Sequence, residues 1–233
     1  MKKVDLSFRS EEEEIMDDLS DNSPALHRAL MELDIINRWL GGNAVTINSV
    51  KKLLLQKPEK NWVMADLGCG SGEMLLKVAK WCRSQNIEIK LHGFDANPNV
   101  IAYAQKHCAA YPEITFHAEN IFSEEFKKRK FDAILCTLFL HHFSSDSLVK
   151  LIEQFKIQAG NVIINDLHRH WFAYYSIKWI TGFFSKSSMV QNDACLSVWR
   201  AFTREDWKAI LNSAKINDYE LDWKWAFRWR LVF

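Results

Sequence analysis

The residues best suited to bind a ligand lie in a glycine-rich turn at 66–73, DLGCGSGE. The turn follows an apolar run and leads into a helical pattern, where glycines let a ligand approach the backbone and a helix start offers free N–H groups. A second apolar run ends at Asp95, 23 residues after Gly72, where a carboxylate can accept hydrogen bonds from both hydroxyls of a ribose. Strand, turn, helix and terminal carboxylate together predict one half of a nucleotide-binding α/β unit.

The charges around this turn discriminate between nucleotide ligands. A dinucleotide site spaces its glycines G-x-G-x-x-G, whereas the third glycine here, Gly72, comes one residue early. Glu73 and Asp66 would repel a pyrophosphate, and no Lys follows the last glycine as a phosphate-binding P-loop requires. A ligand that carries an ammonium, a sulfonium and a ribose suits this acidic turn better. The sequence therefore favours S-adenosylmethionine as the cofactor.

At these residues the chain resembles class I S-adenosylmethionine-dependent methyltransferases, over a stretch from about 61 to 166. The turn at 66–73 looks like the family's first motif and 95–98 like its second. The segment 118–121 looks like the third, which meets the adenine, with Asn120 in place of the commoner Asp. The resemblance implies a set of cofactor-binding residues: Asp66, Gly68, Cys69, Gly70, Gly72, Asp95, Ala96, Asn97, Asn120, Ile121 and Thr137.

The rest of the pattern predicts the fold that positions these residues. Apolar runs and helical patterns alternate through the central region, which is typical of a doubly wound α/β fold. Strands are expected near 62–66, 90–95, 115–118, 131–137 and 161–166, with helices near 72–84, 97–109 and 146–158. With the alternating tail, these elements and the resemblance imply a mostly parallel seven-stranded sheet of the Rossmann-like methyltransferase type.

Two further segments are expected to cover the sheet's ligand-binding edge. Residues 1–60 are predicted to form an N-terminal helical cap, and 61–233 the S-adenosylmethionine-binding domain. In the cap, the acidic run 11–14 is typical of a solvated helix start, and helices are predicted from Pro24 to about Leu40 and over 45–55. The resemblance places this helix pair across the cofactor site.

Residues 167–202 are too long for a plain loop, and their many aromatics suggest a helical insertion on the substrate side. A capping box beginning at Thr203 predicts a further helix through Ala214. In the tail, large apolar residues occupy every second position from Tyr219 to Phe233. This alternation predicts two β-strands joined by a tight bend near 225–228, although no Gly or Asn marks the turn.

Methyl transfer is a displacement at an activated carbon, so the protein mainly positions the acceptor, excludes water and sometimes removes a proton. The predicted catalytic residues are His141 and His142, which follow the fourth strand, and Asp166 and His168, which end the fifth. His168 is the preferred base, while an ion pair that anchors the insertion is an equally good interpretation of its segment. No metal site is predicted.

A cation near the cofactor is expected at Arg38, which could contact the methionine carboxylate. The alternative interpretation of Arg38 is the cation that commonly occupies the last turn of a helix.

Outside the core, the cap, the segment at 166–170 and the tail look like bacterial methyltransferases associated with type III polyketide synthases. This resemblance implies methylation of a phenolic hydroxyl on a small hydrophobic polyketide or resorcinol-like acceptor. C-methylation of a quinone precursor and a non-catalytic cofactor-binding partner subunit remain alternatives. A nicotinamide-dependent oxidoreductase is disfavoured by Glu73.

Composition limits the partners and the compartment. The chain has 233 residues, a formal charge of +1 and five cysteines without paired spacing. This balance gives no basis for nucleic-acid binding, and the cysteines predict reduced thiols in a cytoplasm. The apolar stretch 171–184 is too short to span a bilayer, so the sequence predicts no membrane span. Peripheral membrane association, and a monomer or a homodimer, stay open.

Overall fold

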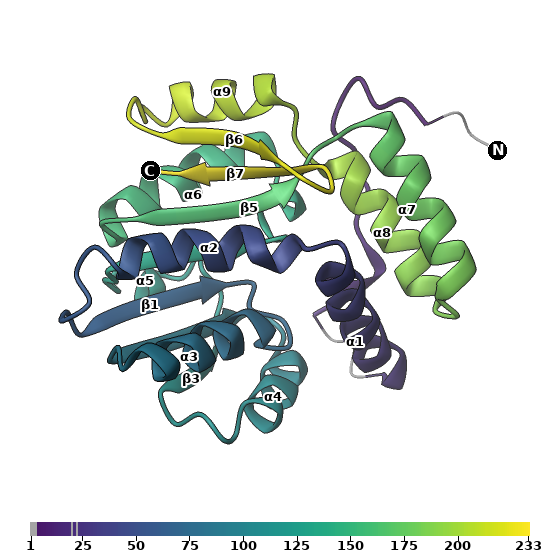
Figure 1. Ribbon diagram of the computed structural model, residues 1–233. Helices are drawn as coiled ribbons and strands as arrows, with labels where there is room; N and C mark the ends of the chain where they lie inside the picture. Colours follow the sequence, from purple (N-terminus) through teal and green to yellow (C-terminus); the bar gives the residue numbers. More distant parts are fainter. Residues whose placement is uncertain (1–3, 20, 22) are drawn as a thin grey trace.

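A seven-stranded sheet forms the centre of the computed structural model, which describes residues 4–19, 21 and 23–233 (Figure 1). The strands are parallel except for β7, which runs antiparallel to both of its neighbours. In order across the sheet they are β3 (Ile114–Ala118), β2 (Ile89–Asp95), β1 (Trp62–Leu67), β4 (Ala133–Thr137), β5 (Val162–Leu167), β7 (Arg228–Val232) and β6 (Glu220–Lys224). The predicted doubly wound, mostly parallel seven-stranded sheet is confirmed.

Helices cover both faces of the sheet, because its central strands are apolar on both sides. One face is covered by α2 (Gly42–Leu54), α3 (Glu73–Gln85) and α4 (Pro98–His107). The other is covered by α5 (Glu124–Lys127), α6 (Ser145–Gln158) and α9 (Arg204–Ser213). Each group encloses its own hydrophobic core against the sheet.

The remaining helices lie beyond the carboxyl ends of the parallel strands, on the right of Figure 1. They are η1 (Ile15–Asp17), α1 (Pro24–Trp39), α7 (Trp171–Phe184) and α8 (Ser188–Arg200), beside the one-turn η2 (Leu140–His142) after β4. A small core joins α1 to α8, with Leu26 and Ala29 packed near Met189 and Val190. We call η1, α1, α7 and α8 the cap.

The insertion at 167–202 is helical, as its aromatics suggested, and forms α7 and α8. The two N-terminal helices, however, pack in different parts of the structure. α1 belongs to the cap, whereas α2 packs on the sheet, with Val50 and Leu54 buried in the same core as Leu75 and Val78 of α3. Of the two helices expected to lie across the cofactor site, α1 contributes several residues to the cavity described below, whereas α2 reaches that cavity with Asn43 of its first turn. The domain boundary near residue 60 stays a prediction.

The tail forms the expected pair of strands, β6 and β7, joined by a tight turn. Ala226 and Phe227 adopt left-handed backbone conformations there, with φ of 61° and 54°. Such conformations are unfavourable for residues with side chains, so packing must stabilise the turn. The ring of Phe227 stacks on His170, with centroids 5.2 Å apart, which ties the turn to the start of α7.

Among the described residues, no helix has the length and apolar character needed to cross a bilayer.

Candidate active site

A cavity of about 760 Å³ lies between the carboxyl ends of the strands and the cap. Its floor is formed by the glycine turn after β1 and by the segments that follow β2, β3 and β4. Its cap side is mostly apolar and includes Leu30, Leu33, Ile36, Ile177 and Ile180. The crevice outside the carboxyl ends of the strands is where open α/β sheets bind ligands.

The glycine turn is shaped by three left-handed residues. Gly68, Gly70 and Gly72 have φ of 67°, 51° and 77°. A Cβ at Gly68 would overlap the ring of Phe139, and one at Gly72 would come within 2.7 Å of Phe116, whereas Gly70 faces open space. The first and third glycines are therefore required by packing, and the second leaves the backbone open to a ligand.

Asp95 ties this turn to the end of β2. Its two carboxylate oxygens accept hydrogen bonds from the backbone N–H of Gly70, at 3.2 Å, and of Asn97, at 3.0 Å. Burial raises the pKa of Asp95 above its ordinary value, although these hydrogen bonds oppose the shift. The carboxylate is thus held at the floor of the cavity, where the sequence predicts a ribose.

Asp66 is almost fully buried beside it, and its Oδ1 atom has no hydrogen-bond partner among the described residues. Burial, with a contribution from the charge of Asp95, raises the pKa of Asp66 to about 8. A cationic ligand group would stabilise the charged form of both carboxylates. Glu73, also on the cavity wall, is paired with Lys77 and contributes less free charge than the sequence suggested.

Most of the predicted cofactor-binding residues meet at this cavity. The lining includes Asp66, Gly68, Cys69, Gly70, Asp95, Ala96, Asn97, Asn120, Ile121 and Thr137. Gly72 lies behind the turn, outside the lining. Arg38 is exposed near the end of α1 and does not line the cavity either, so the structure argues against its predicted contact with a methionine carboxylate. The role of each residue toward the cofactor stays a prediction.

Two adjacent histidines follow β4, and each has its Nδ1 atom paired with a carboxylate. His141 is buried, with Nδ1 2.7 Å from Oδ1 of Asp166. Oδ2 of Asp166 accepts the backbone N–H of Leu140, at 2.9 Å. Burial alone would raise the pKa of Asp166, but the charge and hydrogen bond of His141 outweigh it and lower that pKa. Asp166 therefore orients His141 from behind the cavity wall.

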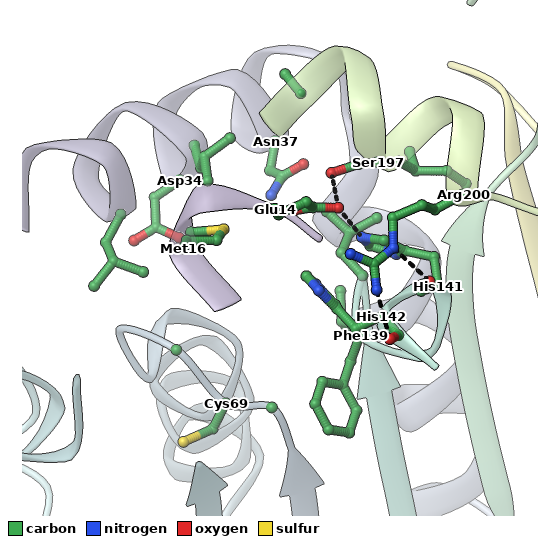
Figure 2. A pocket seen from close by; sticks show the side chains of 18 of the residues that line it. Glu14, Met16, Asp34, Asn37, Cys69, Phe139, His141, His142, Ser197 and Arg200 are labelled. Carbon is green, nitrogen blue, oxygen red and sulfur yellow. Dashed lines mark hydrogen bonds and ion pairs between the residues drawn. The ribbon is translucent and has the colours of Figure 1, made fainter. Parts of the chain in front are cut away.

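His142 has the more open position. Its Nδ1 atom is 2.7 Å from Oδ1 of Asp17, whose other oxygen accepts a hydrogen bond from Arg200 at 2.7 Å. Burial would raise the pKa of Asp17, but its partners His142 and Arg200 hold that pKa well below its usual range. Figure 2 shows the ring of His142 projecting into the cavity, with Arg200 behind it. The Nε2 atom of His142 is left to face a ligand.

Glu14 is the unexpected member of this site. The sequence placed it in a solvated run, and Glu11 to Glu13 are exposed, but Glu14 is 4% exposed. Its Oε1 atom accepts a hydrogen bond from Ser197, at 2.9 Å, and lies 3.6 Å from Nε2 of His141. Burial raises the pKa of Glu14 to about 7. The expectation of a solvated Glu14 was wrong.

A long-range contact explains why the acidic run turns inward at this residue. Asp193 of α8 is buried, and its carboxylate accepts the backbone N–H groups of Ile15 and Met16, at 2.9 and 3.0 Å. These bonds fix the start of η1 on α8 and direct Glu14 toward Ser197. The interaction joins segments about 180 residues apart in the chain, so no local pattern announces it.

His168, the preferred base, lies outside the cavity lining. Its Nδ1 atom accepts a hydrogen bond from the indole of Trp223, at 3.2 Å, and its ring packs edge-on against Trp229. Burial, helped by the charge of His170, lowers the pKa of His168 to about 4. The structure therefore argues against His168 as the base.

The neighbouring residues of this segment have structural roles. Arg169 is buried and donates to the carboxylate of Asp206, at 2.8 Å, and to the carbonyl of Ala201, at 2.6 Å. The side chain of His170 accepts the backbone N–H of Phe172 at the start of α7. The segment anchors the insertion, which was the alternative interpretation from sequence.

Glu14, His141 and His142 also offer potential metal-ligand atoms within 4.8 Å of one another. Arg200, however, donates to the backbone carbonyls of both histidines, which places a guanidinium charge beside the group. A nearby cation disfavours a second one, so we treat the group as a hydrogen-bond network. The absence of a metal stays a prediction.

Comparison with known proteins agrees with this geometry. Residues 64–157, which contain the glycine turn, Asp95 and both cavity histidines, match a family described as a methyltransferase domain. This match and the order of the strands agree with the predicted resemblance to class I S-adenosylmethionine-dependent methyltransferases. One solved structure of similar fold, the magnesium protoporphyrin IX methyltransferase of Synechocystis PCC 6803, contains bound SAM.

Individual relatives of this methyltransferase domain are distant. The carboxy-S-adenosyl-L-methionine synthase of Idiomarina loihiensis is 23% identical over 141 residues, which are 59% of this chain and 58% of that protein. The match thus spans less than two thirds of that relative's length.

Two solved structures show the same fold. The magnesium protoporphyrin IX methyltransferase of Synechocystis PCC 6803, with bound SAH, is 19% identical, with a TM-score of 0.53 over 82% of both chains. The plantazolicin methyltransferase, in complex with a triazolic desmethylPZN analog and SAH, is 16% identical, with a TM-score of 0.61 over 84% of this chain and 83% of that one.

Proposed function

We propose that the protein transfers a methyl group from S-adenosylmethionine to the phenolic hydroxyl of a small hydrophobic acceptor, of the polyketide or resorcinol type. One observation carries this proposal. A single cavity brings together the acidic glycine turn, a histidine oriented by a carboxylate, and a cap wall of apolar side chains. The three parts suit the sulfonium donor, the acceptor hydroxyl and the acceptor's carbon skeleton, respectively.

The cofactor would lie along the floor of the cavity. Asp95 would accept hydrogen bonds from the ribose hydroxyls, and Asn120 and Ile121 would meet the adenine. Asp66, with its unpaired oxygen, would face the positively charged amino-acid end. S-adenosylmethionine bound there would supply its methyl group near the segment that follows β4, where His142 lies.

His142 is the proposed proton acceptor. The phenol gives its proton to Nε2 of His142, while Nδ1 stays bonded to the charged carboxylate of Asp17, which stabilises the imidazolium. The phenolate oxygen then attacks the methyl carbon, the carbon–sulfur bond breaks, and its electron pair stays on the sulfur of S-adenosylhomocysteine. His141 and Asp166 would hold the loop that carries His142.

The cap wall supports a hydrophobic acceptor. Phe172, Ile177 and Ile180 of α7 and Leu33 and Ile36 of α1 all line the cavity, and burying such surface contributes about 25 cal/mol per Å². The two solved structures of this fold are named for chemically different compounds, magnesium protoporphyrin IX and plantazolicin. The fold alone therefore does not select the acceptor.

The outer face of α7 suggests where the acceptor is met. Trp171, Trp179, Phe183 and Phe184 are 61 to 84% exposed, and residues 167–192 contain no acidic side chain. Exposed aromatics beside cations are typical of helices that lie on an anionic membrane surface. We therefore include peripheral membrane association in the proposal, with cytoplasmic localisation and a monomer or homodimer as untested predictions.

Vesicle sedimentation tests the proposed peripheral membrane association. The protein should co-sediment with vesicles that contain phosphatidylserine, and the double variant Trp179→Ser/Phe183→Ser should stay in the supernatant. Equal sedimentation of both proteins would remove the membrane from the proposal.

Product analysis tests the function itself. The protein is incubated with methyl-labelled S-adenosylmethionine and a panel of alkylresorcinols and quinone precursors, and products are identified by mass spectrometry. A labelled methyl on a phenolic oxygen supports the proposal, whereas a label on a ring carbon indicates C-methylation. Binding of the cofactor without label transfer to any panel member, alone or with cell extract, would indicate a non-catalytic partner subunit.

A further inference from the structure

Arg228 is a buried cation at the cavity wall that the methyl-transfer mechanism does not use. It begins β7, directly after the left-handed turn, and its register partner on β5 is Leu167. The residue is 2% exposed and contributes to the cavity lining. Its guanidinium lies against Gly42, at the start of α2, where a Cβ would overlap it. The absent side chain at Gly42 therefore makes the room that the guanidinium occupies.

Most of this guanidinium has no partner. Its Nη2 atom donates to Oδ1 of Asn37, at 2.8 Å, but Nε and Nη1 have no hydrogen-bond acceptor among the described residues. No described carboxylate lies within 4.0 Å of the Arg228 guanidinium, the limit for an ion pair. Asp166 exerts a favourable charge effect, but its oxygens already serve His141 and backbone N–H groups. An unpaired buried charge is costly, and a bound anion would offset that cost.

The guanidinium of Arg228 stays positively charged at neutral pH. Burial lowers the pKa of Arg228 only to about 10. Nearby, Asn43 also lines the cavity, and its amide Nδ2 atom is buried without a hydrogen-bond acceptor among the described residues. Unsatisfied donors of one charged and one neutral group thus gather at the same wall, which is what a bound anion would require.

We propose that Arg228, together with Asn37 and Asn43, binds a carboxylate group inside the cavity. The planar guanidinium presents paired N–H donors that match the two oxygens of a carboxylate, and Asn43 adds a further donor. A single cation flanked by amides suits a group with one negative charge. The cavity walls around it remain apolar, so the ligand is an amphipathic acid.

Two sources could supply this carboxylate. One is the acceptor itself, which would make it a hydroxylated aromatic acid; this source rests on the proposed function. The other is the amino-acid end of the cofactor, taking the role that the sequence assigned to Arg38.

The strand order favours the acceptor. Arg228 starts on β7, three strands from β1, and strands lie about 4.8 Å apart, so its backbone is roughly 14 Å from the glycine turn. From there the side chain extends to the start of α2, where its guanidinium lies against Gly42.

Calorimetry with the full chain distinguishes the two sources without turnover. In the cofactor arm, S-adenosylmethionine is compared with its decarboxylated analogue. In the acceptor arm, benzoate is compared with benzamide on protein saturated with S-adenosylhomocysteine. Arg228→Met removes the charge, and Arg38→Met, an exposed arginine outside the cavity, is the matched control.

In one of the two arms, Arg228→Met should lower the affinity for the carboxylate ligand at least tenfold, about 1.4 kcal/mol. The ligand without the carboxylate should change less than twofold, and Arg38→Met should behave like the wild type. Unchanged affinity for both carboxylates, or equal loss with and without the carboxylate, would overturn the proposal.

A second variant keeps the test decisive if Arg228→Met does not fold. Gly42→Ala leaves the charge in place but displaces the guanidinium, and the φ of Gly42 is outside the left-handed range. It should lose the same discrimination between carboxylate and neutral ligand. Because every readout is binding, an inactive protein that still selects carboxylates would refute the proposed function and leave this inference standing.

Discussion

The two sides of the cavity are built in different ways. On the cofactor side, the glycine turn and Asp95 come from one strand–helix–strand unit, and the contact between Gly70 and Asp95 spans 25 residues. On the cap side, Asp17 contacts His142 across 125 residues, and Ser197 contacts Glu14 across 183. A local unit carries a motif that can be recognised, whereas a site assembled from distant segments depends on the whole fold. Cofactor binding and proton transfer should therefore respond to substitutions on different sides of the cavity.

The largest effect is expected on the cap side. His142→Asn removes the proposed proton acceptor while keeping a polar side chain, so kcat should fall by about 10²- to 10⁴-fold. The affinity for S-adenosylmethionine should change less than about twofold, because the cofactor side is untouched. Turnover and calorimetry on the same preparation check both values. An equal loss in His168→Asn would show that the wrong histidine has been chosen.

The reverse pattern is expected on the cofactor side. Asp95→Ala removes the proposed ribose acceptor, and the affinity for S-adenosylmethionine should fall by about tenfold or more, the loss of hydrogen bonds to a charged group. At saturating cofactor, kcat should recover to within a few-fold of the wild type. Calorimetry and saturation kinetics measure the two values, and Asp132→Ala, a carboxylate outside the cavity, is the control. A variant that binds normally would break the division.

The third prediction concerns the stability of the cap. Burial raises the pKa of Glu14 from 4.5 in the unfolded chain to about 7, so the folded state holds this proton more tightly. The free energy of unfolding should therefore fall as the pH rises from about 4.5 to 7, and then level off. Glu14→Gln should remove this part of the pH dependence, on the order of 3 kcal/mol, since each pKa unit corresponds to about 1.4 kcal/mol.

Urea unfolding at pH 5 and pH 7.5 measures this difference, with the exposed Glu13→Gln as the control. Parallel pH profiles for Glu14→Gln and the wild type would show that Glu14 is not a buried acid.

The smallest effect is expected at Asp66. Burial raises its pKa to about 8, and a cationic ligand favours its charged form, so affinity for S-adenosylmethionine should rise as the pH increases from 6 to 8.5. We expect a change of about three- to tenfold that Asp66→Asn abolishes, since each pKa unit corresponds to a factor of ten. Calorimetry at several pH values tests this. An identical pH dependence in both proteins would assign the proton to another group.

The same contrast explains what could be predicted from sequence. The mostly parallel sheet could be predicted from alternating strands and helices, and the expected ligand from the acidic glycine turn, because both depend on local patterns. The bend at Ala226 and Phe227 was located by alternation alone, although packing of Phe227 on His170 rather than a turn residue stabilises it.

Sequence reasoning failed where long-range contacts decide. Glu14 could not be told from its acidic neighbours, because the contacts that direct it inward come from Asp193 and Ser197, far along the chain. His168 ends a parallel strand, as a catalytic residue often does, but the antiparallel β7 covers that position with Trp229. Arg228 lies in an alternating tail whose other charges face solvent or pair with acids.

The most direct test of the account is a crystal structure of the protein with S-adenosylhomocysteine. We expect the ribose hydroxyls within hydrogen-bond distance of Asp95, the amino-acid end beside Asp66, and the sulfur facing the ring of His142. A ligand bound away from the glycine turn, or one whose sulfur is separated from His142 by protein side chains, would contradict the account.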